Sequence, residues 1–124
     1  MVTTDISQLT AECNTWRQQM RNYRDEFTQL KNKLRQIAPK VTQKELLQDV
    51  EHYENQFHIQ LINIHDLKHS IKVHDFKASI AGDNSVAAHN ISAEHAYLHD
   101  QFQRLQQMLQ ELKEAFQKFI SRLT

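Results

Sequence analysis

The sequence predicts an all-α fold: an up-down-up three-helix antiparallel bundle with coiled-coil-like heptad seams. Two observations lead to this prediction. The chain of 124 residues has one glycine and one proline, which leaves little room for the turns that strands need. Its apolar residues recur at steps of three and four over three long stretches, which is the period of packed helices. The length favours one domain, residues 1–124, with helices at about 5–37, 43–81 and 85–123.

The first expected helix, residues 5–37, has one narrow apolar stripe, and nearly every other position in it is polar. Pro39 disfavours helical geometry at the residue before it and therefore ends this helix. Cys13 is the only cysteine, and because it lies on the stripe we expect a small buried core residue rather than a reactive thiol. The stripe consists of Ile6, Leu9, Cys13, Trp16, Met20, Tyr23, Phe27, Leu30, Leu34 and Ile37.

The second expected helix, residues 43–81, has a marked beginning and end. Thr42 stands three residues before Glu45, which predicts a capping box at its start. Gly82 suits the position just past its end. Gln60 and His74 interrupt an otherwise apolar inner seam. That seam consists of Leu46, Val50, Tyr53, Phe57, Gln60, Ile64, Leu67, Ile71, His74 and Ala78.

The third expected helix has three candidate N-caps, Asp83, Asn84 and Ser85. Short connections make neighbouring helices antiparallel, so the three helices should lie side by side. The seam of the third helix consists of Ala88, Ile91, His95, Leu98, Phe102, Leu105, Leu109, Leu112, Phe116, Phe119 and Leu123. A tryptophan and heptad seams over three helices are similar in length and layout to spectrin-like bundles.

The composition disfavours several classes of function. Lysine plus arginine equals aspartate plus glutamate, so the formal net charge is zero and a nucleic-acid partner is not expected. No apolar run is long enough to cross a bilayer, and the first residues lack a signal-peptide pattern. We therefore expect a cytoplasmic protein without a membrane partner. The sequence has no glycine-rich phosphate loop and no recognisable histidine–nucleophile arrangement, so we expect no enzyme activity and no cofactor.

The second helix carries a further apolar stripe on the side opposite its inner seam. A helix that is apolar on two sides is usually covered on two sides. We expect an interaction surface here, covered by a second copy of the chain in a homodimer. A different protein, or another helix of the same chain, is an alternative cover. The stripe consists of Ile59, Ile62, Val73, Phe76 and Ile80.

The chain has eight histidines, and two pairs have the i,i+4 spacing that lets two imidazoles hold one metal ion. These pairs are His65 with His69, and His95 with His99. Their heptad positions do not converge on a common point, so we expect no metal site and keep a histidine-rich metal-binding bundle as a further alternative. His74 and His95 lie on seams and should be partly buried.

One short segment suggests another function. The run from His65 to Ser70, HDLKHS, resembles the phosphoacceptor segment of histidine phosphotransfer domains, which are helical bundles of about this size. The resemblance implies that His65 accepts the phosphoryl group and that Lys68 balances its charge. The family has glycine where this chain has His69, whose side chain would crowd the phosphoryl group. A phosphorelay module using His65 is therefore the alternative function.

Overall fold

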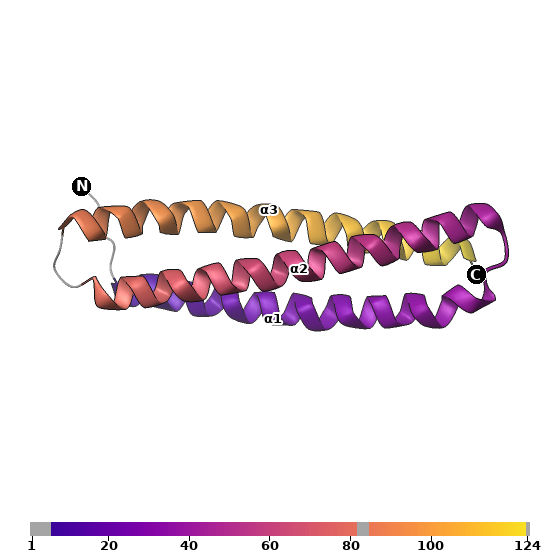
Figure 1. Cartoon of the computed structure of the whole chain (residues 1–124), viewed down its shortest axis with the longest axis horizontal. Helices are drawn as coiled ribbons and strands as arrows, with labels where there is room; N and C mark the ends of the chain where they lie inside the picture. The colour runs from indigo at the N-terminus through magenta and orange to yellow at the C-terminus, as the bar shows by residue number, and fades with distance from the viewer. Residues whose placement is uncertain (1–5, 82–84, 124) are drawn as a thin grey trace.

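The computed structural model describes residues 6–81 and 85–123, which form three long helices lying side by side along one axis (Figure 1). Helix α1 spans Ile6–Ile37, α2 spans Lys44–Ile80 and α3 spans Ser85–Leu123. A short 3₁₀ helix, η1 at Ala38–Lys40, follows α1. The fold is therefore the expected all-α three-helix bundle, and the expected start at Asp5 lies outside the described residues.

The connection between α1 and α2 differs in one detail from the sequence prediction. The backbone N–H of Val41 donates to the carbonyl of Ala38 at 3.1 Å, which closes η1. The chain is then extended at Val41 and again at Gln43, which has φ −74° and ψ 131°. Gln43 is the N-cap residue of α2, and no side chain caps the helix. The predicted capping box at Thr42 was therefore wrong, because the extended segment delays the helix start by one residue.

The end of α2 is described as far as Ala81, whose N–H donates to the carbonyl of Ala78 at 3.4 Å. The predicted cap residues of this turn, Gly82, Asp83 and Asn84, lie outside the described residues. Helix α3 begins at Ser85, where the sequence placed it. Among the described residues, no helix combines the length and the apolar character that crossing a membrane requires.

The core follows the three predicted seams closely. Nearly all seam positions are buried or partly buried, including the polar residues Gln60 and His74. Ile6 and Ala88, the first members of the seams of α1 and α3, are exposed. The buried part of each of these seams therefore begins one step later, at Leu9 and Ile91.

The core is richest in aromatic rings near η1. The ring of Phe57 on α2 lies 5.9 Å from that of Phe27 on α1 and 4.9 Å from that of Phe116 on α3, both edge to face. Tyr53 continues the cluster, with its ring 5.1 Å from Phe119. Edge-to-face pairs of this kind add to the free energy gained by burying the rings. One layer of rings thus joins all three helices.

The three helices do not approach each other equally. The backbone of α2 comes close to those of both α1 and α3, whereas α1 and α3 meet mainly through long side chains. Gln106 Nε2 on α3 donates to the Tyr23 hydroxyl on α1 at 3.2 Å, and Lys113 Nζ lies 3.0 Å from Glu26 Oε2. The space between α1 and α3 therefore accommodates large side chains.

Candidate functional site

The predicted interaction surface lies on the outside of the bundle. We call it the outer face of α2: Ile59, Ile62, Val73, Phe76 and Ile80. These side chains are between 39% and 67% exposed, so neither α1 nor α3 covers them within the described parts of the chain. Asp66 and His69, which interrupt the same row, are also exposed.

A groove between α2 and α3 runs beside this face and has a volume of about 520 Å³. Asp66 and Leu67 line it from α2, and Tyr97 and Met108 line it from α3. Tyr97 is 62% exposed and Met108 45% exposed, so apolar surface extends across the groove. The sequence analysis did not single out these two residues; their sequence signal is that they are large apolar side chains off the α3 seam.

A second groove, between α1 and α2, is basic. It has a volume of about 260 Å³, and His65, Lys68 and His69 of the predicted phosphoacceptor segment line it. His65 and His69 are exposed there, while Lys68 is partly buried. We call this the basic groove; its lining residues are Arg17, Arg21, His65, Lys68, His69 and Lys72.

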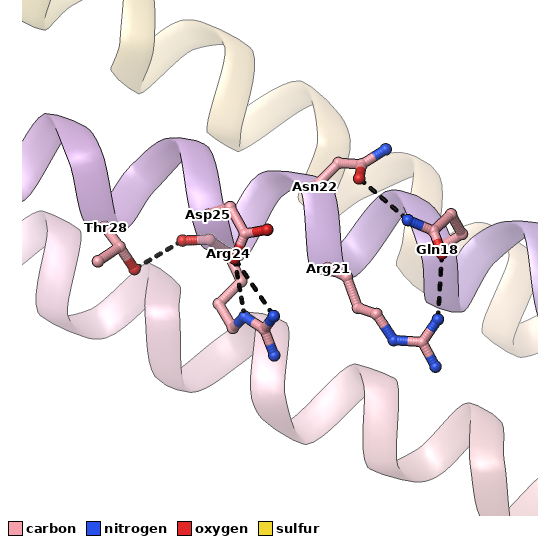
Figure 2. A network of polar contacts seen from close by, with 6 residues as sticks. All are labelled: Gln18, Arg21, Asn22, Arg24, Asp25 and Thr28. Atoms are coloured by element: carbon pink, nitrogen blue, oxygen red, sulfur yellow. Dashed lines mark hydrogen bonds and ion pairs between the residues drawn. The ribbon is translucent and has the colours of Figure 1, made fainter.

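Burial and nearby arginine charges change the pKa of Lys68. Partial burial lowers the pKa of the Lys68 ammonium, and the positive charges of Arg24, Arg21 and Arg17 lower it further. Figure 2 shows Arg21 and Arg24 extending from α1 toward the neighbouring α2 ribbon. Arg21 Nη1 donates to Gln18 Oε1 at 3.2 Å, and Arg24 Nη2 donates to Asp25 Oδ1 at 3.2 Å (Figure 2). Of these two arginines, Arg21 lines the basic groove.

A chain of hydrogen-bonded side chains crosses the bundle at another point. His74 on α2 is fully buried, and its Nδ1 lies 2.6 Å from Glu94 Oε1 on α3. His74 Nε2 lies 2.9 Å from Nδ1 of His95, also on α3. His95 Nε2 in turn lies 3.1 Å from Glu12 Oε2 on α1. We call these four residues together with Cys13 the imidazole cluster.

The outer ends of this chain are carboxylates. Burial disfavours the charge on Glu94, but hydrogen bonds from His74 and Lys77 outweigh burial and lower the pKa of this carboxyl below its ordinary value. Lys77 Nζ lies 3.3 Å from Glu94 Oε2. Glu94 is therefore an ionised acceptor for His74, while its other oxygen faces Lys77 near the surface.

Cys13 lies beside the two imidazoles. One ligand atom from each of Cys13, His74 and His95 can be chosen so that all three lie within 4.8 Å of one another. Burial raises the pKa of the Cys13 thiol to about 12, and the negative charges of Asp75 and Glu12 act in the same direction. The thiol is fully buried and protonated, as the sequence analysis expected of a core residue.

The histidine pairs singled out from the sequence have different surroundings. His65 and His69 both line the basic groove. His95 belongs to the imidazole cluster, whereas the exposed His99 packs its ring 5.5 Å from that of Trp16. The structure instead brings His95 together with His74 from another helix. Comparison with protein-family models, curated proteins and solved structures found no match to this chain.

Proposed function

We propose that this chain is a non-enzymatic, cytoplasmic helical-bundle protein that acts through protein–protein association, and that a second copy of the chain covers the outer face of α2. The observation that carries the proposal is the exposure of that face. Phe76 is 65% exposed and Ile80 is 67% exposed. Burying a large apolar side chain is worth about 1.5–3 kcal/mol, so a row of such side chains favours association.

The order of residues along the face supports an antiparallel second copy. The face has the three-and-four spacing of a coiled-coil seam, in which residues of one helix pack against those of its partner. In an antiparallel pairing, Ile59 falls opposite Phe76 of the second copy. In the same register Ile62 falls opposite Val73. Apolar side chains therefore meet apolar side chains on both sides of the axis, while Ile80 lies beyond these pairs, opposite Asn55 of the second copy.

The two polar residues of the row also match in this register. A two-fold axis between Leu67 and Lys68 places Asp66 opposite His69 of the second copy, and the symmetry repeats the pair. An aspartate facing a histidine is favourable, and it fixes the register because a slip would bring polar side chains against apolar ones. This complementarity favours a second copy over an unrelated protein.

The size of the contact suggests that α3 contributes to it. From Ile59 to Ile80 the face is about 32 Å long, at a rise of about 1.5 Å per residue. A stable interface buries about 800 Å² on each partner, which is more than one narrow helix stripe supplies. Tyr97 and Met108 line the adjoining groove and extend the apolar surface. We therefore expect both residues to be covered in the dimer.

The mass of the protein in solution tests the proposal. We expect the wild-type chain to be a dimer, and the double variant Ile62→Ser with Phe76→Ser to be a folded monomer by light scattering and circular dichroism. Leu47→Ser is the matched control, because Leu47 is a 40% exposed apolar residue of α2 outside the face. That variant should remain a dimer. A wild-type monomer, or a folded double variant that remains a dimer, would refute association through this face.

A charge exchange tests the register separately. His69→Glu places a glutamate opposite Asp66 of the second copy, so the like charges should weaken the dimer. Adding Asp66→Lys to His69→Glu restores opposite charges and should restore the dimer. If the double charge variant is weaker than His69→Glu alone, the antiparallel register is wrong.

A second candidate function is favoured by the position of His65 in the basic groove. Lysine and arginine side chains there could hold a phosphoryl group on the exposed imidazole, because they would neutralise its negative charge. The group would come from a phosphorylated donor: the donor's bond to phosphorus breaks while a bond to a nitrogen of His65 forms. The resemblance of the segment 65–70 to histidine phosphotransfer domains agrees with this role.

Phosphoramidate labelling tests this second candidate. In this reaction the phosphorus–nitrogen bond of the reagent breaks, ammonia leaves, and His65 gains the phosphoryl group. We expect labelling of the wild type, loss of it in His65→Gln, and slower labelling in Lys68→Ala. His58→Gln is the control, since His58 is an exposed histidine of α2 outside the groove. Equal labelling of wild type and His65→Gln would rule out the candidate.

A further inference from the structure

The imidazole cluster has the ligand chemistry of a metal centre. We propose that Cys13, His74 and His95 bind a zinc ion inside the bundle, with one ligand from each helix. A thiolate and two imidazole nitrogens are ligands that Zn²⁺ prefers. Neither histidine pair with metal-ligand spacing in the sequence supplies this set, which comes from three separate seams. The site is independent of the outer face of α2.

The distances are close to those of a bound ion. In a tetrahedral site, zinc–nitrogen bonds are about 2.0–2.1 Å long and a zinc–sulfur bond is about 2.3 Å long. The two nitrogens then lie about 3.3 Å apart, and each lies about 3.5 Å from the sulfur. His74 Nε2 and His95 Nδ1 are 2.9 Å apart, and the ligand atoms of Cys13, His74 and His95 all lie within 4.8 Å of one another. Small side-chain movements therefore suffice to form the site.

The hydrogen bonds leave the inner nitrogens suited to a cation. A carboxylate only accepts, so His74 Nδ1 and His95 Nε2 are the nitrogens that carry protons toward Glu94 and Glu12. In neutral imidazoles, the remaining nitrogens would then direct two lone pairs at each other across 2.9 Å. A cation between the two nitrogens would remove this repulsion, and a metal ion is one such cation.

The outer partners also match those of a zinc site. Histidines that bind a metal usually donate their other ring N–H to a carboxylate, which fixes the tautomer and raises the basicity of the ligand nitrogen. His74 and His95 each have such a carboxylate, Glu94 and Glu12. Trp16 stacks on the His95 ring and holds its orientation. Ring orientation is thus set before any ion binds.

The charge balance permits an ion in this buried place. Zinc binding would displace the proton of the Cys13 thiol, and the thiolate offsets one of the two positive charges of the ion. The carboxylates of Glu12 and Glu94, each within hydrogen-bond distance of a ligand imidazole, offset the remaining charge. Glu12 and Glu94 reach the surface, with their side chains 40% and 36% exposed, so both ends of the chain of hydrogen bonds contact solvent.

Cobalt titration of chelator-treated protein without a histidine tag tests the proposal. We expect one Co²⁺ per chain, with the near-ultraviolet absorption band of a thiolate bound to cobalt, and displacement of Co²⁺ by Zn²⁺. Cys13→Ala should abolish the band, and His74→Gln should abolish or strongly weaken it. The control is His65→Gln with His69→Gln, which removes an exposed i,i+4 pair. This control should retain the wild-type titration.

A second measurement tests the outer partner. Glu94→Gln retains the shape of the side chain but removes its charge, so the zinc affinity should fall about 10–100-fold in competition with a coloured chelator. Lys118→Gln, an exposed position of α3, should leave the affinity unchanged. The proposal is overturned if the folded wild type gives no thiolate–cobalt band, or if the band remains in Cys13→Ala.

Discussion

The indole of Trp16 on α1 stacks on the imidazole of His95 on α3, with ring centroids 4.6 Å apart and an interplanar angle of 24°. The indole also lies 5.9 Å from the ring of Phe102. Trp16 therefore fills the space between two helices whose backbones approach each other least. Its ring joins the imidazole cluster to the apolar core.

We expect Trp16→Ala to be among the most destabilising single changes in the chain. It leaves a large cavity between α1 and α3, and such truncations of buried aromatic residues cost about 3–5 kcal/mol in the free energy of unfolding. Urea denaturation followed by circular dichroism measures this cost. Tyr97→Ala, at an exposed aromatic position of α3, should change the free energy of unfolding of the dissociated protein by no more than about 0.5 kcal/mol. Equal losses in the two variants would show that Trp16 does not connect the helices.

The phenol of Tyr53 makes stability depend on pH in the alkaline range. Burial raises its pKa above the ordinary 10.0, partly offset by the positive charge of Arg122, while Asp49 raises it further. The unfolded chain therefore releases this proton at a lower pH than the folded protein does. The contribution of Tyr53 is fully present below about pH 10 and is lost as the pH rises through its native pKa.

Tyr53→Phe isolates this effect because it retains the ring that packs against Phe116 and Phe119. The free energy of unfolding of the wild type should fall more steeply between about pH 9 and pH 11 than that of the variant. The difference between the two curves cancels the titration of the lysines and of the other tyrosines. Parallel curves would mean that the phenol of Tyr53 titrates normally in the folded protein.

The fold was predictable because the apolar pattern alone sets it. Three long seams with steps of three and four residues and two short connections leave one simple arrangement, and the observed helices begin and end within about one residue of the predicted bounds. The start of α2 was mispredicted because Thr42 and Glu45 match a capping box by residue type. Residue type alone does not show where the backbone becomes helical, and here the chain is still extended at Gln43.

The imidazole cluster was harder to predict. Cys13, His74 and His95 all lie on predicted seams, but each is on a different helix, so no spacing within one helix connects them. Contacts between helices depend on how far each helix is shifted along its neighbours, and the seam pattern within each helix does not give this shift. Glu12 and Glu94 each stand one position before a seam residue in the sequence, so the seam pattern does not single them out.

The thiol of Cys13 should react very slowly in the folded protein. Alkylation requires the thiolate, and a pKa of about 12 in place of 9.0 lowers its fraction roughly a thousand-fold in mildly alkaline buffer. We expect iodoacetamide to modify chelator-treated native protein at least about a hundred times more slowly than protein in urea, because local opening limits the effect. Trp16→Ala opens the core nearby and should speed the reaction. Similar rates in buffer and in urea would show that Cys13 is accessible.

Leucine suits a heptad position, but replacing each of the two buried polar residues of the α2 seam by leucine should have a different effect on the free energy of unfolding. Gln60 is 7% exposed, and its Oε1 accepts one hydrogen bond, from Asn63 Nδ2 at 3.2 Å. Asn63 lines the open groove between α2 and α3, so water can replace this partner. Gln60→Leu should therefore leave the free energy of unfolding unchanged or raise it by up to about 1 kcal/mol.

His74→Leu should instead destabilise the chelator-treated protein by about 1–3 kcal/mol, because it leaves His95 Nδ1 inside the bundle without its hydrogen-bond partner. Removing both imidazoles should be less costly than the sum of the single changes, since the double variant His74→Leu with His95→Leu leaves neither nitrogen unpaired. Urea denaturation of the single and double variants measures this coupling. Strictly additive losses would mean that the hydrogen bond between the two imidazoles contributes nothing to the stability of the bundle.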